Sequence, residues 1–131
     1  MMTIRSYRDL DVWKLGMKLA ASTYEATAGF PPAERYGLSS QLQRCAVSIP
    51  SNIAEGHQRD STRDFLRFLS IAQGSLAELE TQLLLAAELG LVGTTTIEQL
   101  LTDAAGLGRM LNGLQSKLRS RLSSVSLASG P

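Results

Sequence analysis

The chain has 131 residues, 44% of them hydrophobic and 19% charged, which suffices for one well-formed core and excludes a disordered chain. Its 13 Lys and Arg against 12 Asp and Glu give a net charge of +1, which excludes a protein that coats nucleic acid through bulk charge alone. The single cysteine excludes an internal disulfide framework, and no apolar run reaches the roughly 18 residues that a membrane helix needs. The composition therefore predicts a single cytoplasmic domain with no membrane partner.

The first predicted helix follows a variant of the capping box, in which Ser6 precedes Asp9 by three residues. The apolar residues of this segment recur at steps of three and four and are predicted to line one face: Leu10, Trp13, Met17, Ala20 and Tyr24. Gly29 and the Phe-Pro-Pro run at 30–32 end this helix, because proline disfavours helical geometry in the residue before it.

The second predicted helix starts either near Pro32 or at residues 39–40, after Gly37, and the sequence leaves both starts open. Pro50 lacks a backbone N–H and is expected to kink this helix, and Gly56 is expected to end it. The apolar stripe of the segment is Leu38, Leu42, Cys45, Ala46, Ile49 and Ile53.

The third predicted helix opens with Ser61 and Asp64, which have capping-box spacing. Its heptad seam consists of Phe65, Leu69, Ala72, Leu76, Leu79, Leu83 and Ala86. A second stripe follows on another face: Phe68, Ile71, Ser75, Glu78, Gln82, Leu85 and Leu89. A helix with two apolar faces predicts contact with a partner chain, and the alternative is that neighbouring helices of the same chain cover the second stripe.

The fourth predicted helix opens with Thr95 and Glu98, again at capping-box spacing, and the Ser-rich chain after Ser120 is expected to fray. Its seam is Leu100, Ala104, Leu107, Leu111, Leu114 and Leu118. Four helices joined by short connections predict an all-α fold, an antiparallel up-down-up-down four-helix bundle. We expect this single domain to span residues 1–122, with 123–131 as a flexible C-terminal tail.

The sequence gives little support for enzymatic chemistry. The one histidine, His57, lies 12 residues from the one cysteine, Cys45, which is about 18 Å along a continuous helix and too far for a thiolate–imidazole pair. Glu78 and Glu80 point in nearly opposite directions on a helix. No Cys/His cluster has metal-ligand spacing, and the glycines form no phosphate-binding loop. The prediction is a protein without catalytic residues, cofactor or metal.

A row of polar residues shares one face of the second predicted helix: Arg44, Ser48, Ser51, Asn52 and Glu55. These side chains can bond one another or the carbonyls freed by Pro50. Alternatively they form contacts with a partner, in which Arg44 and Glu55 pair reciprocally across a symmetric interface. Together with the second stripe of the third helix, this row gives the predicted oligomer interface: Arg44, Ser48, Asn52, Glu55, Phe68, Ile71, Ser75, Glu78, Gln82 and Leu85.

Several strings of the chain closely resemble one known family. They are Tyr7-Arg8-Asp9-Leu10 with Val12-Trp13, Phe30-Pro31 with Tyr36-Gly37-Leu38, the nine-residue SIPSNIAEG at 48–56, and the runs 65–72, 74–76 and 78–83. The family is that of the 23S rRNA intervening-sequence proteins, and the resemblance covers about residues 5 to 120. It implies a small bacterial cytosolic four-helix bundle that assembles as a ring of five, without an agreed biochemical activity. A related protein, the accessory variability determinant of diversity-generating retroelements, implies nucleic-acid binding and a reverse-transcriptase partner.

The charges separate between the two ends of such a bundle. The end formed by the starts of the first and third helices carries the candidate nucleic-acid-binding residues: Arg5, Arg8, Arg59, Arg63, Arg67, Lys117, Arg119 and Arg121. These eight basic residues against five acidic ones give this end +3, while one basic against five acidic residues gives the other end −4. Five parallel copies at +3 would make +15, which attracts phosphates at low salt. Local pairing of Arg63 and Arg67 with Asp60 and Asp64 is the alternative.

Two functional hypotheses from different classes follow. The first is an RNA- or DNA-binding accessory protein whose ring presents the basic end to the nucleic acid. The second is a protein–protein interaction scaffold, which docks a partner such as a reverse transcriptase and has no nucleic-acid role.

Overall fold

The computed structural model describes residues 6–128 of the chain and the side chains of residues 6–124. Two short 3-10 helices and four α-helices follow one another in this order: η1 (Tyr7–Asp9), α1 (Asp11–Thr27), η2 (Pro32–Glu34), α2 (Leu38–His57), α3 (Thr62–Glu88) and α4 (Thr94–Ala128). No strand occurs among the described residues. The all-α class predicted from the sequence is therefore confirmed.

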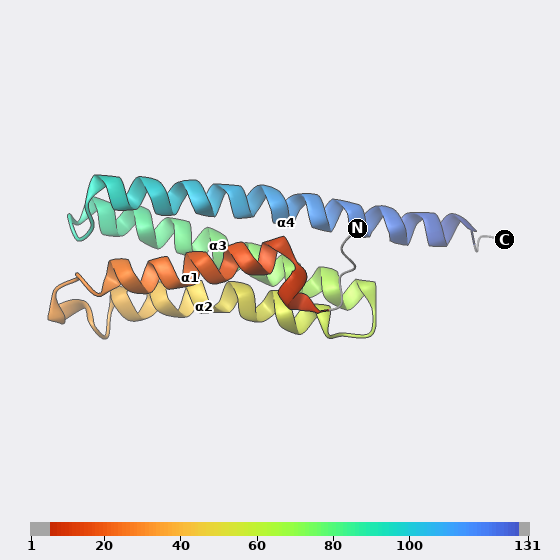
Figure 1. Cartoon of the computed structure of the whole chain (residues 1–131), viewed down its shortest axis with the longest axis horizontal. Coiled ribbons are helices and arrows are strands. Elements are labelled where there is room, and N and C mark those ends of the chain that lie inside the picture. Colours follow the sequence, from red (N-terminus) through yellow and green to blue (C-terminus); the bar gives the residue numbers. More distant parts are fainter. Residues whose placement is uncertain (1–5, 129–131) are drawn as a thin grey trace.

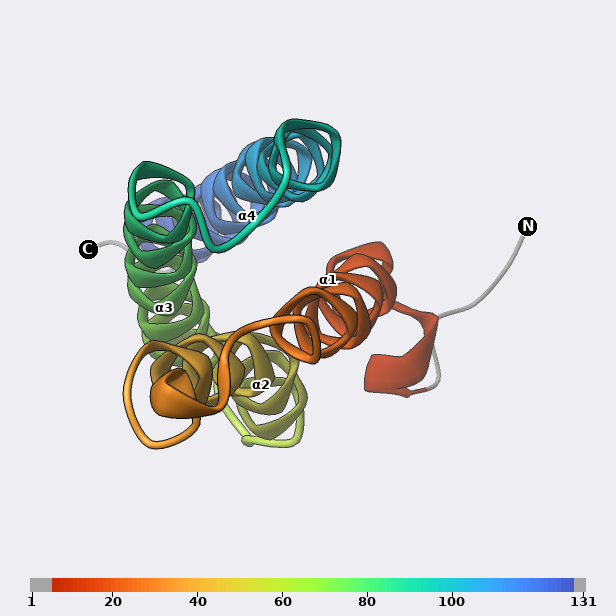
Figure 2. The ribbon, with the colours of Figure 1, turned by 90° about the vertical axis from the view of Figure 1, so that its left-hand side faces the viewer.

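Successive helices run in opposite directions along one long axis (Figure 1). Helix α1 contacts α2, α2 contacts α3, α3 contacts α4, and α4 closes the bundle against α1. Within the described part of the chain no Cα atoms of the diagonal pairs, α1 with α3 and α2 with α4, lie within 8 Å of each other. The view along the axis shows the four helices around a shared interior (Figure 2). This is the up-down-up-down bundle that the sequence predicts.

Two predicted capping motifs are present. Ser6 and Asp9 form a reciprocal capping box, but the box caps the short helix η1, and α1 begins later, at Asp11. Ser61 accepts the backbone N–H of Asp64 at 3.1 Å and fixes the start of α3.

Helix α3 ends in a Schellman motif. The backbone N–H of Gly90 donates to the carbonyl of Ala87 at 3.0 Å, and that of Leu91 donates to Ala86 at 2.9 Å. Gly90 has a φ of 72°, a left-handed conformation that side chains with a Cβ atom rarely adopt. This turn directs the chain back along the bundle into α4.

Helix α2 begins at Leu38, the later of the two starts left open by the sequence. The region near Pro32 forms the separate 3-10 helix η2. Pro50 lies inside α2 and does not end it. The helix continues to His57, one residue beyond the predicted end at Gly56.

Helix α4 differs from the prediction at both ends. Its first residue is Thr94, so Thr95 lies inside the first turn and does not precede it as a cap. The helix continues to Ala128, well beyond Ser120, because serine only weakly disfavours helical geometry. Residues 129–131 of the predicted tail lie outside the described residues.

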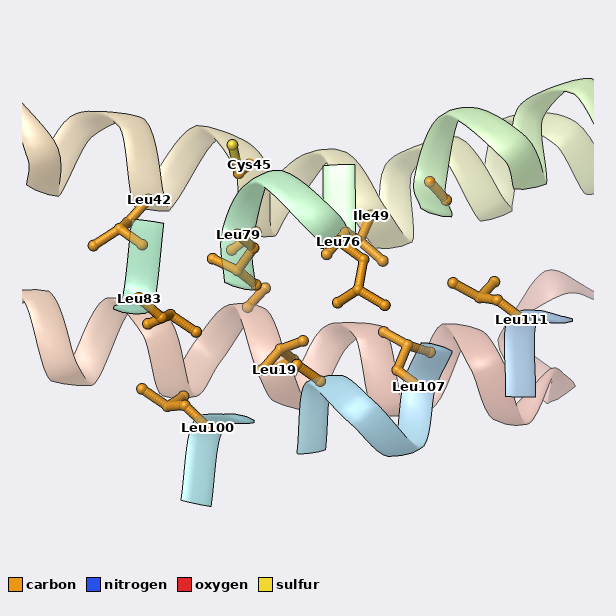
Figure 3. Packing of buried hydrophobic residues seen from close by; sticks show 14 of the residues in the cluster. Leu19, Leu42, Cys45, Ile49, Leu76, Leu79, Leu83, Leu100, Leu107 and Leu111 are labelled. Carbon is orange, nitrogen blue, oxygen red and sulfur yellow. The ribbon is translucent and has the colours of Figure 1, made fainter. Parts of the chain in front are cut away.

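The core contains the predicted seams of α2, α3 and α4. Every residue of the α2 stripe is buried, and the α3 and α4 seams are buried except for the half-buried Phe65 and Leu114. Leucine side chains of all four helices point into the shared interior, among them Leu19 of α1, Leu42 of α2, Leu79 of α3 and Leu107 of α4 (Figure 3). Burial of these side chains is the main stabilising contribution to the bundle.

The predicted apolar face of α1 is only partly buried, because Leu10 and Ala20 lie in the core while its larger side chains do not. Trp13 is only half-buried, while Met17 and Tyr24 are 46% and 48% exposed. A Cβ atom added to Gly16 would lie 3.5 Å from Cβ of Pro50, so α1 approaches α2 closely at this glycine, while Met17 and Tyr24 remain on the outside. The buried residues of this helix are Val12, Gly16, Leu19, Ala20, Thr23 and Thr27.

Candidate oligomer and nucleic-acid interfaces

The polar row of α2 and the second stripe of α3 lie side by side, as the predicted interface requires. The Oγ atoms of Ser48 and Ser75 are 2.8 Å apart, and Sγ of Cys45 donates to Oε2 of Glu78 at 3.4 Å. These contacts join α2 to α3 within one chain. We call this surface the α2/α3 face, defined by the predicted interface residues.

Further polar contacts on the α2/α3 face are also internal. Nδ2 of Asn52 donates to the carbonyl of Ser48 at 2.8 Å and to its Oγ at 2.9 Å, and Nε2 of Gln82 donates to Oε1 of Gln41 at 3.4 Å. The carbonyl freed by Pro50 is that of residue 46, four positions earlier, so Asn52 does not bond the freed carbonyl. The polar row thus stabilises the pairing of α2 with α3.

Arg44 and Glu55, the two charged residues of the polar row, bind residues of α2 or of the turn that follows it. Nη2 of Arg44 donates to Oγ of Ser40 at 3.1 Å, and Glu55 forms an ion pair with Arg59 at 3.7 Å. Both arginine and glutamate are exposed, so reciprocal pairing with a second chain stays a prediction.

Cys45 is a neutral thiol in this setting. Burial raises its pKa, and the hydrogen bond to Glu78 and the negative charge of that carboxylate raise it further. A thiol with a raised pKa is a poor nucleophile at neutral pH. Cys45 therefore acts as a buried contact between α2 and α3.

Phe68 belongs to the chain's own interior, although the sequence places it in the predicted interface. Its side chain is 6% exposed. The guanidinium groups of Arg59 and Arg67 lie 4.9 and 4.7 Å from its ring centroid. Neighbouring side chains thus cover the stripe at this position, while Ile71 and Leu85 remain 43% and 47% exposed.

The basic residues predicted to meet at one end do so. The starts of α1 and α3 and the ends of α2 and α4 share one end of the bundle (Figure 1), here called the basic end. Of the eight predicted basic residues, Arg5 lies outside the described residues. The other seven are exposed: Arg8, Arg59, Arg63, Arg67, Lys117, Arg119 and Arg121. Against five acidic residues, these seven give the described part of this end a net charge of +2.

Some of these cations are already engaged. Arg59 pairs with Glu55 at 3.7 Å and Arg67 with Asp64 at 3.8 Å. The second pair is part of the local pairing that the alternative expects, whereas Arg63 forms no ion pair with Asp60 or Asp64. Within the described residues Arg63, Lys117 and Arg121 form no ion pair: the three are available to an anion.

A groove between α1 and α2 was missed by the sequence reasoning. It has a volume of about 440 Å³, and its lining includes Trp13, Met17 and Tyr24 from α1 with Val47 and Pro50 from α2. We call it the α1/α2 groove. The sequence contains a signal for it, because Trp13, Met17 and Tyr24 belong to the predicted apolar face of the first helix.

The described residues show no arrangement of side chains that is typical of a catalytic or metal site. The ring of His57 packs edge-on against Phe65 with centroids 5.5 Å apart, while Cys45 contacts Glu78. No group of three or more His, Cys, Asp or Glu in the described part of the chain could hold a metal ion. No described helix is both long and apolar enough to cross a membrane.

These features define a class, a small antiparallel four-helix bundle with a polar α2/α3 face and exposed cations at one end. The profile of the 23S rRNA-intervening sequence protein family matches residues 8–113, and the chain belongs to this family. A solved structure with the same fold is a protein of unknown function from the S23 ribosomal protein family of Bacteroides thetaiotaomicron, with a TM-score of 0.75 and 23% identity over 80% of this chain and 95% of that chain. No curated protein matches the chain.

Proposed function

We propose that this protein is a non-enzymatic, cytoplasmic RNA-binding accessory protein that assembles as a ring of five and binds RNA through its basic end. The observation that carries the proposal is the group of exposed, unpaired cations at that end, Arg63, Lys117 and Arg121. The family name, which refers to 23S rRNA, supports RNA as the ligand.

The paired arginines of the basic end add to this surface. Exposed ion pairs such as Arg59–Glu55 and Arg67–Asp64 contribute only about 0–1 kcal/mol each. A phosphate group can therefore compete for either guanidinium at modest cost, since arginine binds phosphate through two parallel hydrogen bonds.

Assembly supplies the charge that one chain lacks. A net charge of +2 on the described part of one basic end is small, and five copies side by side would make +10. The Debye length is about 10 Å at 0.1 M salt, so charges on neighbouring subunits act together only at low ionic strength. Binding of this kind is electrostatic and depends steeply on salt.

A gel-shift titration with a labelled RNA tests the proposal. The double variant Arg63→Ala/Arg121→Ala removes two unpaired cations from the basic end, and Arg35→Ala/Arg109→Ala is the matched control, because it removes two exposed cations from elsewhere. We expect the first variant to lower affinity by about tenfold or more, since each lost phosphate contact reduces counterion release, and the control to change it little.

Equal losses in the two variants would show that the basic end is not the binding surface. Absence of RNA binding by the wild-type protein at low salt would overturn the RNA proposal, and an intact oligomer under those conditions would favour the protein–protein scaffold.

A further inference from the structure

The α1/α2 groove presents aromatic rings along most of α1. Trp13 is half-buried and Tyr24 is exposed, and both line the groove together with Tyr7 of η1. The rings of Tyr7 and Trp13 meet edge to face, with their centroids 5.5 Å apart. Tyr24 lies 11 residues after Trp13, which is about 16 Å along a helix at 1.5 Å per residue. One surface of the bundle thus offers three aromatic side chains.

The groove begins at the basic end. Tyr7 belongs to η1, directly before the start of α1 (Figure 1), and the guanidinium group of Arg8 lies 5.7 Å from the centroid of its ring. Lys14 is exposed on α1 three residues before Met17, and residues at this spacing are neighbours on a helix surface. Neither Arg8 nor Lys14 forms an ion pair within the described residues. Two available cations therefore flank the groove.

The lining of the groove suits a nucleobase. No carboxylate belongs to it among the described residues, and Ser51 supplies a hydroxyl group between apolar side chains. Proteins that bind single-stranded nucleic acid combine cations that follow the backbone with aromatic rings on which bases stack. Aromatic side chains can stack on the bases of single strands, loops and ends, which are free of their neighbours. An apolar protein segment in the groove would leave both cations without a partner.

We propose that the α1/α2 groove holds unpaired bases of a single-stranded RNA whose backbone continues onto the basic end. This inference rests on the RNA-binding part of the proposed function and names its substrate class. Bases stack on Trp13 and Tyr24, and phosphates bind Arg8 and Lys14 beside them. The basic end supplies attraction for any RNA, and the groove selects strands whose bases are free.

The fluorescence of Trp13 tests the groove directly, because the chain has one tryptophan. We expect a short single-stranded RNA to quench this fluorescence as it binds at low salt, since a base stacks on or beside the indole ring. A blunt-ended duplex of the same sequence should bind the basic end in a gel shift and leave the fluorescence unchanged. Single-stranded RNA that binds without quenching would overturn the groove assignment.

Replacing one exposed ring tests the stacking. Tyr24→Ala removes a ring from the groove, and Tyr36→Ala is the matched control, because Tyr36 is an exposed tyrosine outside the groove. We expect Tyr24→Ala to weaken binding of the single strand about fivefold or more. Tyr24→Phe keeps the ring, so it should bind as the wild type and Tyr36→Ala do. Equal affinities of Tyr24→Ala and the wild type for the single strand would overturn the stacking.

Salt dependence separates the groove from the basic end. Tyr24→Ala should weaken binding by the same factor at each salt concentration, because a lost base stack leaves counterion release unchanged, whereas Arg63→Ala/Arg121→Ala should reduce the slope. A shallower slope in Tyr24→Ala would show that the variant disturbs the basic end and would overturn the assignment of Tyr24 to a base.

The remaining outcomes separate this inference from the proposed function. Equal binding of duplex and single strand, unaffected by Tyr24→Ala, would overturn the groove inference alone and leave the basic end as the binding surface. A lower oligomeric state of Tyr24→Ala in analytical ultracentrifugation, with unchanged RNA affinity, would assign the groove to a second copy of the chain. Absence of RNA binding by the wild-type protein at low salt would overturn the proposed function, and the groove inference with it.

Discussion

Phe68 lies where the helical period predicts it, but it is buried within its own chain and does not lie open as a predicted interface residue would. Its position in the second stripe of α3 is correct, but Arg59, in the turn after α2, and Arg67, in α3, both lie against its ring. Each such contact contributes about 0.5–1 kcal/mol at an exposed site. Sequence spacing cannot show this, because Arg59 follows α2 and reaches the ring only in the folded chain.

Cys45 makes a pH-dependent contribution to stability. Burial and Glu78 raise its pKa above the ordinary value of 9.0, so the folded chain holds the thiol proton more tightly than the unfolded chain does. The contribution is fully present below pH 9.0 and is lost as the pH rises through the raised pKa. We expect the free energy of unfolding, from urea denaturation, to decrease more steeply with pH in this range for the wild type than for Cys45→Ala.

The difference between the two proteins is the informative quantity, because lysines and tyrosines titrate in the same range in both. Cys45→Ala will be less stable at every pH through loss of packing. Parallel stability curves above pH 9.0 would contradict the role assigned to the thiol.

At the scale of the helix, the period of the hydrophobic residues predicted the buried faces of three of the four α-helices. The stripes of α2, α3 and α4 are buried as expected because leucine and isoleucine dominate them. Helix α1 has two overlapping faces at helical spacing, one with large side chains and one with small ones. The small face packs inward because Gly16 lets the helix approach Pro50, a preference that depends on the shape of α2 and not on hydrophobicity.

The crossing of α2 and α3 near the basic end depends on Gly56. A Cβ atom added there would lie 2.6 Å from Cβ of Phe68 and 3.1 Å from Cδ1 of Phe65. We expect Gly56→Ala to lower the free energy of unfolding by about 1–3 kcal/mol, because the two helices must separate to relieve the clash. Thermal and urea denaturation measure this loss.

Gly74→Ala is the matched control, since it also replaces a helical glycine but adds a methyl group to open space. Alanine there should raise stability by up to about 1 kcal/mol, because glycine is the poorer helix former. Equal effects of the two substitutions would show that the close approach at Gly56 is not a constraint.

At the scale of the whole molecule, the sequence predicted the topology, the basic end and the neighbourhood of the α2/α3 face. These follow from helix count, short connections and alternating direction, which bring residues distant in sequence to the same end. The sequence did not predict the α1/α2 groove, because Met17 and Tyr24 have the composition of core residues and only three-dimensional packing distinguishes an inner face from an outer one.

The size of the assembly should determine the salt dependence of RNA binding. The logarithm of the binding constant falls with the logarithm of salt concentration in proportion to the number of phosphates neutralised, with a slope of about −0.7 per phosphate for single strands. A variant of the predicted oligomer interface that is monomeric by analytical ultracentrifugation, for which we take Ile71→Asp at an exposed position, offers one basic end in place of several. We expect it to bind RNA more weakly and with a shallower slope in a filter-binding titration than the wild type.

Leu84→Asp is the control for the added negative charge, because Leu84 is an exposed leucine of α3 outside the predicted oligomer interface. Equal slopes for monomeric Ile71→Asp and the wild type would show that each chain binds RNA independently, whatever its oligomeric state.

The order of helix contacts bears on how the chain reaches its native state. Three of the four contacts join helices that are consecutive in the chain, and only the contact between α4 and α1 joins the two remote ones. Local topologies of this kind fold within microseconds to milliseconds, because little loop-closure entropy is lost before contacts form. The α1–α2 and α3–α4 hairpins can thus form early, and the remote contact between the first and last helices completes the bundle.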